Sequence, residues 1–371
     1  MPFTEPEPAK SPGAPSRGGR ISGSRKLAGL PPRATITQVA ERAGVSIATV
    51  SRVLNNVPHQ VAAATRRRVL RAIRELEFRP NALARSLHQR RTHTIGLIIP
   101  DISNAYYAEI ARGIEEALSR HQYTLIACNT DRRVDRISHY LATLCEKQVD
   151  GIILGGGGTL NGRHMAAFQG CGVRTVLIGR YGVDLPAIRV DNVKGAWEAA
   201  NHLLKLGHHR IAILAGPKSS TTTVDRLAGY RQAFAEAGVR IPREWCLYGD
   251  LRPESGREAA DRLMAGKSRP SAILAINDQM AIGAMRAVHR LGMRVPDEVS
   301  VVGFDDIALA SFVTPALTTM ALPLHQMGVA AGEMILRALA GEAQPREVWF
   351  NPRLVVRESS AAPPAGRKGE A

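Results

Sequence analysis

The stretch Thr35–Asn55, TITQVAERAGVSIATVSRVLN, predicts two short helices joined by a tight turn. Thr35 can cap the first helix, and Gln38, three residues later, completes the pattern of a capping box. Gly44 is suited to the left-handed conformation with which helices often end. Ser46 can then cap the second helix, because its hydroxyl can accept a bond from the first turn.

Apolar residues recur through this stretch, and beyond it, at the spacing of one helix face. We expect helices over residues 36–43, 47–54 and 64–76. Their shared apolar seam consists of Val39, Ala40, Val45, Val50, Val53, Val69, Ala72, Ile73 and Leu76. Three short helices around one seam, with a tight turn after the first, predict a helix-turn-helix head over residues 34–80.

The second helix of such a head enters the major groove of DNA. Ile47 and Ala48, at its start, can touch thymine methyl groups, and Arg52 can pair bidentately with a guanine. The polar residues that can reach phosphates or base edges are Thr49, Ser51 and Asn55. The alternative is a helical hairpin that packs on its own protein, with these side chains in solvent.

The positive charge of the chain is concentrated at its N-terminal end. The 371 residues carry a net charge of +16, of which residues 1–34 contribute +4 and residues 35–91 contribute +8. This asymmetry indicates a polyanionic partner, although a membrane surface would also attract the charge. Residues 1–33 contain seven prolines and five glycines and are expected to form a disordered basic tail.

From residue 94 the pattern changes to short apolar runs separated by amphipathic helices. The runs of strand length are 94–100, 124–129, 151–154, 175–179, 210–215, 272–276 and 300–304. The expected helices span residues 106–119, 136–147, 194–206, 225–237, 256–264 and 278–291. This alternation predicts the α/β class, with doubly wound parallel sheets and helices on both faces. Ligands of such sheets bind outside the carboxyl ends of the strands.

Membrane and secreted proteins fit the chain poorly. No apolar run reaches 18 residues, and the N-terminus lacks the apolar region of a secretory signal, so we expect a cytoplasmic protein. The four cysteines are scattered and are expected to be reduced, buried thiols. They are Cys128, Cys145, Cys171 and Cys246.

No catalytic or metal-binding pattern stands out. Gly155–Gly158 follows a strand but lacks the GxxxxGK[ST] pattern of a phosphate-binding loop, which favours a turn at the rim of a cleft. His202, His208 and His209 are close in sequence, but no further residues complete a metal site. We therefore expect neither an enzyme nor a metal or cofactor.

The stretch Thr35–Asn55 resembles the headpiece of the lactose repressor family, as do Thr65-Arg66, Arg79-Pro80-Asn81 and residues 81–87. The resemblance extends from Gly96 to about Glu358. It implies a DNA-binding transcription regulator, usually a repressor, that binds a palindromic operator as a homodimer. In that family residues 81–93 would form a hinge helix and linker that order on DNA. Composition alone favours a plain linker here.

The resemblance also implies DNA contacts outside the second helix. In the hinge, Leu87 would wedge into the central base step through the minor groove, with Arg85 in the negative potential nearby. The further contacts it implies are Thr35, Ser46, His59, Asn81 and Ala84. Ala62 departs from the family, which usually has a serine or threonine at the start of the third helix, and a looser helix start is expected.

Residues 94–358 resemble the periplasmic sugar-binding-protein fold (type I), on which the sensor of this family is built. The chain would cross between two subdomains near Asn192, Met320 and Val348. The N-subdomain would comprise about 94–192 and 322–347, and the C-subdomain about 193–321 and 348–358. Residues 359–371 are expected to be a disordered tail.

Side chains that match ligand contacts of this fold lie at the ends of the expected strands. They are Asn104, Tyr106, Tyr107, Arg180, Arg226, Asn277 and Asp305. Together they supply donors, acceptors and a stacking face, which suit a polyhydroxylated ligand. Each also has a structural alternative, as a turn cap, a surface charge or a core aromatic.

Two departures bear on the effector. Ala321 stands where sugar binders of this fold often have a glutamine, and Gly179 stands where pentose binders often have an aspartate. A sugar is the expected effector, with a nucleobase or nucleoside as the alternative. Its binding would change the angle between the subdomains and thereby the spacing of the two hinge helices. A transport binding protein and an enzyme are the rival classes.

Overall fold

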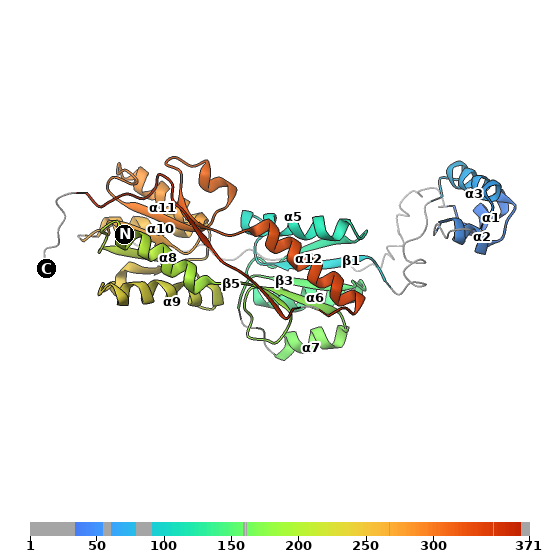
Figure 1. Ribbon diagram of the computed structural model, residues 1–371, viewed down its shortest axis with the longest axis horizontal. Helices are drawn as coiled ribbons and strands as arrows, with labels where there is room; N and C mark the ends of the chain where they lie inside the picture. Colours follow the sequence, from blue (N-terminus) through green and yellow to red (C-terminus); the bar gives the residue numbers. More distant parts are fainter. Residues whose placement is uncertain are drawn as a thin grey trace, which may run out of the picture. The chain divides into compact units, whose positions relative to one another are not determined.

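The structure is a computed structural model that describes residues 34–54, 61–78, 91–158, 160, 162–266, 268–343 and 345–364. The chain divides into two compact units, residues 1–85 and 86–371. The first unit is helical and the second contains two parallel sheets covered by helices (Figure 1). Within the described residues, no helix is both long enough and apolar enough to cross a membrane.

The small unit contains α1 (Ile36–Ala43), α2 (Ile47–Leu54) and α3 (Ala63–Glu75). Thr35 and Gln38 form the expected capping box, and Gly44 ends α1 in the left-handed conformation, with φ 63°. Val39, Val50 and Val69, one from each helix, are completely buried. The three helices therefore share the apolar seam that their spacing predicts.

The start of α3 is uncapped. Ala62 is its N-cap residue and makes no side-chain hydrogen bond to the first turn, so the looser start expected from this alanine stays a prediction. Arg42 of α1 forms an ion pair of 2.7 Å with Glu75 of α3. Both side chains are largely exposed, so this pair contributes little to stability.

The large unit contains two six-stranded sheets. The strands of the first sheet lie in the order β11-β5-β4-β3-β1-β2 and are parallel. Their bounds are β1 (Thr94–Ile99), β2 (Thr124–Asn129), β3 (Gly151–Gly155), β4 (Arg174–Ile178), β5 (Ala187–Val190) and β11 (Glu347–Phe350).

Helices cover both faces of the first sheet (Figure 1). They are α5 (Ala105–Ser119), α6 (Val134–Glu146), α7 (Gly162–Cys171) and α12 (Leu324–Ala340). Leu97 of β1 packs in the same cluster as Ile114 of α5, whereas Ile98 packs in a separate cluster with Leu141 of α6. Successive strand residues therefore face opposite layers, as the pleat of a strand requires. The inner strands β1, β3 and β4 are buried on both faces and are almost entirely apolar.

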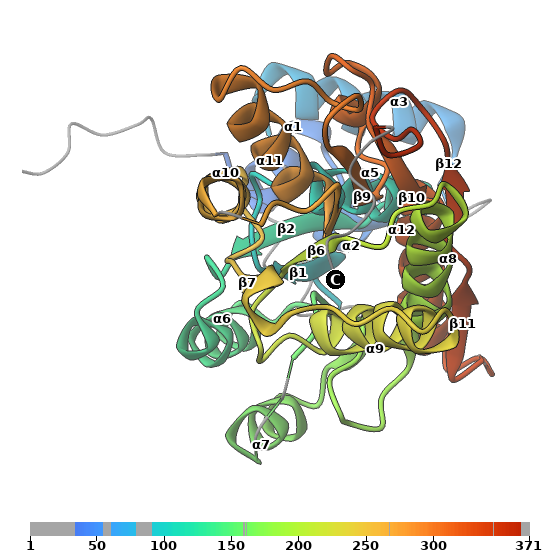
Figure 2. The same cartoon turned by 90° about the vertical axis from the view of Figure 1, so that its left-hand side faces the viewer.

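The second sheet has the strand order β12-β10-β9-β8-β6-β7, with only β12 antiparallel to its neighbour among the pairs described. Its strands are β6 (Ile211–Ala215), β7 (Cys246–Tyr248), β8 (Ala272–Ala275), β9 (Ser300–Asp305), β10 (Thr318–Ala321) and β12 (Arg353–Val355). Its helices are α8 (Asn192–Lys205), α9 (Thr221–Glu236), α10 (Pro253–Ala265) and α11 (Asp278–Arg290). The pairs α8/α9 and α10/α11 cover opposite faces (Figure 2). Two short 3₁₀ helices span Arg243–Trp245 and Ala308–Ser311.

The chain crosses between the sheets three times, after β5, after β10 and after β11. The third crossing was predicted near Val348, and it lies just beyond this residue, between Phe350 and Arg353. Val348 lies in β11, where it pairs with Ile188 of β5 in the first sheet. The parallel pairing of β11 with β5 continues to Phe350, so the C-subdomain resumes only with β12.

The prediction of a disordered tail from residue 359 was wrong for its first residues. Ser359 is completely buried, and its hydroxyl donates to the carbonyl oxygen of Val301 at 2.6 Å and accepts from the N–H of Thr318 at 2.8 Å. The carbonyl oxygen of Ala361 accepts from Nε2 of buried His208 at 2.8 Å. This segment is therefore part of the second subdomain, bound along β9 and β10.

Two of the four cysteines were wrongly expected to be free thiols. Cys145 and Cys171 form a disulfide, with a Cα–Cα distance of 5.7 Å, whereas Cys128 and Cys246 are free. The two partners are 26 residues apart and stand at the ends of α6 and α7. These helices contact each other on the same face of the sheet, which brings the two sulfurs together.

Candidate functional site

The exposed surface of α2 carries the residues expected to read DNA. Ile47 has 48% of its surface exposed, which is unusual for a large apolar side chain, and Ala48 and Arg52 are exposed beside it. Thr49 and Ser51 are partly buried. The opposite face of α2 is held in the core by Val50 and Val53.

Two of the predicted DNA contacts also cap helices. The Thr35 hydroxyl accepts from the N–H of Gln38 at 3.3 Å, and the Ser46 hydroxyl accepts from the N–H of Thr49 at 3.2 Å. Both side chains are exposed, and in the caps their hydroxyl oxygens act as acceptors. Their O–H groups can therefore donate to a phosphate oxygen, so capping and phosphate contact are compatible. The remaining predicted DNA contacts lie outside the described residues. They are Asn55, His59, Asn81, Ala84, Arg85 and Leu87.

A cavity of about 340 Å³ lies between the two subdomains of the large unit. It is bordered by the segments that follow β1, β2 and β3 on one side, and by those that follow β6, β7, β8 and the end of β9 on the other. Six of the seven predicted effector residues line it. They are Asn104, Tyr106, Tyr107, Arg226, Asn277 and Asp305.

Arg226 and Asp305 form a buried ion pair of 3.1 Å in this cavity. The guanidinium also donates from Nε to Asn192 at 2.9 Å and from Nη1 to the carbonyl oxygen of Ile276, and it lies 3.5 Å above the ring of Phe304. Burial raises the pKa of Asp305 to about 6, although the charge of Arg226 opposes this shift. Among the described residues, three of the five N–H groups of Arg226 are used, which leaves donors for a ligand.

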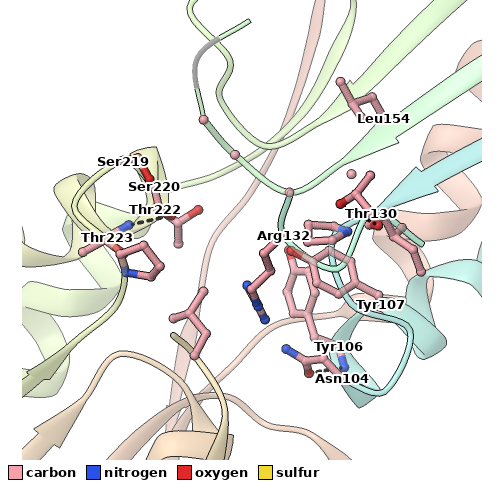
Figure 3. Close-up of a pocket in the computed structure, with 18 of the residues that line it drawn as sticks. Asn104, Tyr106, Tyr107, Thr130, Arg132, Leu154, Ser219, Ser220, Thr222 and Thr223 are labelled. Carbon is pink, nitrogen blue, oxygen red and sulfur yellow. Dashed lines mark hydrogen bonds between the residues drawn. The ribbon is translucent and has the colours of Figure 1, made fainter. Parts of the chain in front are cut away.

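Three tyrosines, Tyr106, Tyr107 and Tyr181, line the cavity. Figure 3 labels the first two. The rings of Tyr106 and Tyr107 lie edge to face, 4.9 Å apart. Burial raises the pKa of Tyr107 to about 12, so its phenol is neutral and able to donate. Tyr181 is buried, and its hydroxyl donates to the carbonyl oxygen of Gly155 at 2.6 Å, so the hydroxyl is already bonded within the protein.

The opposite wall carries hydroxyl groups from the start of α9. Ser219, Ser220, Thr222 and Thr223 line the cavity, across from the tyrosines in Figure 3. The Ser220 hydroxyl caps α9 by accepting from the N–H of Thr223 at 3.3 Å. Oγ1 of Thr223 is buried without a hydrogen-bond partner among the described residues.

The two asparagines of the site also serve as helix caps. Oδ1 of Asn104 accepts from the N–H of Tyr106 at 3.0 Å, and Oδ1 of Asn277 accepts from the N–H of Met280 at 3.0 Å. Nδ2 of Asn277 donates to the carbonyl oxygen of Leu251 at 3.1 Å. Nδ2 of Asn104 has no partner among the described residues, so Asn104 retains a donor for the cavity whereas Asn277 is largely committed to the fold.

Matches to known proteins agree with both units. Residues 35–81 match the family model "Bacterial regulatory proteins, lacI family", and residues 200–360 match "Periplasmic binding protein-like domain". The HTH-type transcriptional regulator DegA of Bacillus subtilis is 37% identical over 335 residues, which are 89% of this chain and 98% of that protein. The chain belongs to the lacI family of bacterial regulatory proteins.

Other relatives of this lacI-family chain include the HTH-type transcriptional repressor PurR of Photobacterium profundum, 36% identical over 88% of this chain and 98% of that protein. Among solved structures, the lac repressor dimer bound to operator and the anti-inducer ONPF has a TM-score of 0.81 and 29% identity over 89% of this chain and 100% of that one. The complex of the transcriptional regulator CelR with cellobiose has a TM-score of 0.68 and 32% identity over 88% of this chain and 100% of that one.

The family confirms the α/β fold class, with its helical head and periplasmic-binding-protein-like core. This lacI-family protein is a DNA-binding transcription regulator. The enzyme alternative is excluded, because members of the family are regulators. Within the described residues, no group of three or more potential ligands that could hold a metal ion was found.

One predicted effector residue of this lacI-family regulator lies beside the main cavity. Arg180 lines a smaller cavity of about 140 Å³ and forms an ion pair of 2.5 Å with Asp225. Its carbonyl oxygen accepts from the hydroxyl of Thr221 at 2.6 Å. Arg180 follows β4 of the first subdomain, and Asp225 and Thr221 belong to α9 of the second, so these contacts join the two subdomains.

The glycine at position 179 has a structural explanation. It has φ 104°, and a Cβ there would lie 1.9 Å from the carbonyl oxygen of Gly156. No side chain, including the aspartate found in pentose binders, fits at this position without movement of the Gly155–Gly158 turn. This glycine-rich turn lines the cavity, as expected for a turn at the cleft rim.

Several cavity residues were not identified from the sequence. They are Thr130, Arg132, Tyr181 and the segment Ser219–Thr223. Thr130 and Arg132 directly follow β2, and Ser219–Thr223 follows β6. Polar residues just beyond the carboxyl ends of expected strands were thus the available signal.

Proposed function

We propose that this lacI-family regulator is a repressor that binds a palindromic operator as a homodimer, under the control of a sugar in the cleft. The proposal depends chiefly on one observation, the cavity of about 340 Å³ whose walls come from both subdomains. A ligand that contacts both walls favours their closed arrangement, because it interacts with both only when they are close. Ligand binding and DNA binding are then linked.

The composition of the cavity supports a polyhydroxylated ligand. Arg226 and Asn104 offer donors, Asp305 offers an acceptor, and the segment Ser219–Thr223 adds hydroxyls that can donate or accept. Tyr106 and Tyr107 offer a stacking surface for the apolar face of a sugar ring. A flat nucleobase would also fit against these rings, so nucleobases belong among the compounds tested.

The exposed face of α2 supports sequence-specific binding. Ile47 and Ala48 are exposed at its start, where apolar side chains can contact thymine methyl groups. Arg52 is exposed one turn later and can pair with a guanine. A dimer would place two such helices in successive major grooves, which a palindromic operator requires.

The test starts with selection of bound sequences from random duplex DNA by the full-length protein at a stated salt concentration. We expect enrichment of a palindrome with a pyrimidine–purine step at its centre. Operator affinity is then measured with neutral sugars, sugar acids, sugar phosphates, nucleobases and nucleosides. If only nucleobases or nucleosides change the operator affinity, the proposal of a sugar effector is contradicted. If the selection enriches no sequence, even when cell metabolites are present, the proposed operator binding is contradicted.

A further inference from the structure

Arg132 has a side chain inside the cleft whose hydrogen-bonding groups the protein does not satisfy. It follows β2 and lines the cavity, and 18% of its side chain is exposed. In Figure 3 its guanidinium lies between the tyrosines of one subdomain and the Ser219–Thr223 segment of the other. Its Nε and Nη2 have no hydrogen-bond partner among the described residues. Leaving buried N–H donors of a permanently charged group without acceptors costs free energy. An acceptor from outside the protein would remove this cost.

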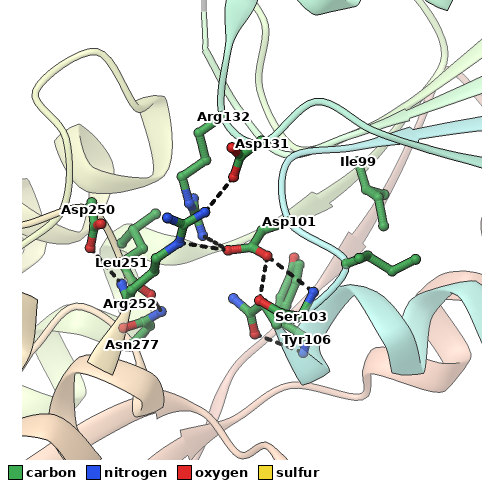
Figure 4. A network of polar contacts seen from close by, with 12 residues as sticks. Ile99, Asp101, Ser103, Tyr106, Asp131, Arg132, Asp250, Leu251, Arg252 and Asn277 are labelled. Carbon is green, nitrogen blue, oxygen red and sulfur yellow. Dashed lines mark hydrogen bonds and ion pairs between the residues drawn. The ribbon is translucent and has the colours of Figure 1, made fainter. Parts of the chain in front are cut away.

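The nearest carboxylate does not supply that acceptor. Oδ2 of Asp101 is 3.6 Å from Nη2 of Arg132, which is beyond hydrogen-bonding distance. Oδ2 already accepts from Nε of Arg252 at 3.3 Å, and Oδ1 accepts from the hydroxyl and the N–H of Ser103 at 2.6 and 3.1 Å (Figure 4). Asp101 is thus shared among several donors, and Arg132 is its most distant partner.

The other charged side chains that line the cavity have closer partners. Arg226 pairs with Asp305, and Arg133 pairs with the neighbouring Asp135 at 2.7 Å. The tyrosine phenols are neutral because burial raises their pKa. Among the described lining residues, Arg132 therefore provides the positive charge that is least compensated.

The start of helix α6, two residues after Arg132, adds to this positive potential. Asp131 and Arg132 have φ 52° and 60°, a left-handed conformation that is unfavourable for non-glycine residues. Helix α6 begins at Val134, and its N-cap residue, Arg133, makes no side-chain cap bond. Both Arg133 and Val134 line the cavity, so the positive end of the α6 dipole lies at the same wall as the Arg132 guanidinium.

We propose that the effector carries an anionic oxygen group, a carboxylate or a phosphate, that binds Arg132. A guanidinium carries its N–H groups in a fork that can bind such an anion through two parallel bonds. The polyhydroxylated remainder of the molecule contacts the hydroxyl wall and the tyrosines. This inference rests on the proposed function, since the effector occupies the same cleft, and it narrows the sugar to a sugar acid or a sugar phosphate.

The experiment compares matched ligands on the full-length protein by calorimetry. The probes are glucose, glucuronate and glucose 6-phosphate, ribose and ribose 5-phosphate, and inorganic phosphate alone. Each is titrated into the wild type, Arg132→Gln, Arg132→Lys and Arg136→Gln. Arg136 is the matched control, because it lies nearby in the first turn of α6 and carries the same charge but does not line the cavity.

We expect an anionic probe to bind at least about tenfold more tightly than its neutral partner, since charge-assisted hydrogen bonds are the stronger ones. Arg132→Gln should remove this difference, Arg132→Lys should retain part of it, and Arg136→Gln should leave it unchanged. Tighter binding of glucuronate than glucose 6-phosphate assigns a carboxylate, and the reverse assigns a phosphate. Unliganded melting temperatures of the variants verify that each one is folded.

Two results overturn the inference. One is equal or tighter binding of the neutral sugars, and the other is the absence of binding by every anionic probe, inorganic phosphate included. A neutral sugar that binds and alters operator affinity would leave the proposed function standing while this inference fails. Conversely, an anionic ligand that binds through Arg132 without any effect on operator affinity would support this inference and contradict control by the cleft.

Discussion

Nη2 of Arg252 donates to Oδ1 of Asp131 at 2.5 Å across the cleft, from one subdomain to the other. Nε of the same guanidinium reaches Asp101 at 3.3 Å, so one side chain holds the segments after both β1 and β2 (Figure 4). At another point Arg180 pairs with Asp225 between the same two subdomains. The arrangement of the two subdomains is therefore stabilised by ion pairs that any separation of them must break.

Arg252→Ala should loosen the cleft while changing the global stability little. The Arg252 side chain is 40% exposed, and partly exposed pairs contribute at most about 1 kcal/mol each. Amide hydrogen exchange of the full-length protein should become faster in the segments 101–103, 131–133 and 250–252. Arg257→Ala is the matched control, since its partners Glu258 and Asp261 lie in its own helix. Identical exchange in the two variants would show that Arg252 does not hold the cleft closed.

Arg52→Ala should relax base preference at one operator position in each half-site. The exposed guanidinium of α2 can form two bonds with a guanine, and their loss costs about 1–3 kcal/mol of discrimination. Binding to every single-base variant of the selected operator measures this effect. Arg67→Ala, which removes an exposed charge from α3, should weaken binding to all variants alike. A preference profile unchanged by Arg52→Ala would rule out this base contact.

Asp305 should make stability depend on pH between about 4 and 6. Burial raises its pKa in the folded protein to about 6, so the folded state binds this proton more readily than the unfolded state does. The resulting stabilisation is present at low pH and is lost as the pH rises through this window. Burial also raises the pKa of the neighbouring Asp278, which acts in the same direction.

Urea denaturation from pH 4 to pH 8 measures this contribution. The stability of the wild type relative to Asp305→Asn should fall by roughly 1–3 kcal/mol up to about pH 6 and then stay constant. Asp297→Asn removes an exposed carboxylate and should show no such change relative to the wild type. A difference that grows with rising pH would mean that Arg226 dominates and that the pKa of Asp305 is lowered.

Gly44→Ala should destabilise the head by about 1 kcal/mol. Gly44 has φ 63° and ψ 44°, and a side chain there meets no atom within 4 Å, so the left-handed backbone is the only source of the cost. Gly44→Asn should lower the free energy of unfolding by less than Gly44→Ala does, because asparagine tolerates the left-handed conformation better than alanine. Amide exchange in α1 and α2 reports the loss. An alanine variant as protected as the wild type would show that the turn does not depend on glycine.

The sequence alone determined the features that depend on near neighbours. The capping box of Thr35 and Gln38 joins residues three apart, and the turn at Gly44 depends on one backbone conformation, so both were predictable. The apolar strands at 94–100 and 272–276 were recognisable because burial on both faces leaves almost no polar residue in them. Because these strands could be recognised, their carboxyl ends could be located too, and ligands of parallel sheets bind there.

Several short strands and two helices were not predicted from the sequence. Strands β5, β7, β10, β11 and β12 are only three or four residues long, and helices α7 and α12 were not expected. Val348 shows why the bounds of the third crossing could not be predicted, since its sheet is decided by a partner, Ile188, 160 residues earlier. The segment that begins at Ser359 likewise has the composition of a disordered tail. Its order depends on hydrogen bonds between Ser359 and two residues far away in the sequence, Val301 and Thr318.

The electrostatics of the cleft were decided by tertiary structure alone. Arg132 and Arg252 are separated by 120 residues, and nothing local distinguishes either from the many other arginines of this basic chain. Folding places Asp131 and Asp101 close to Arg252, which leaves Arg132 without a full partner. Hydrogen bonds and ion pairs act over a few ångströms, so the packing of the two subdomains decides which charged groups have partners. Helix caps and apolar periodicity, in contrast, depend on residues within one or two helical turns and can be recognised from the sequence.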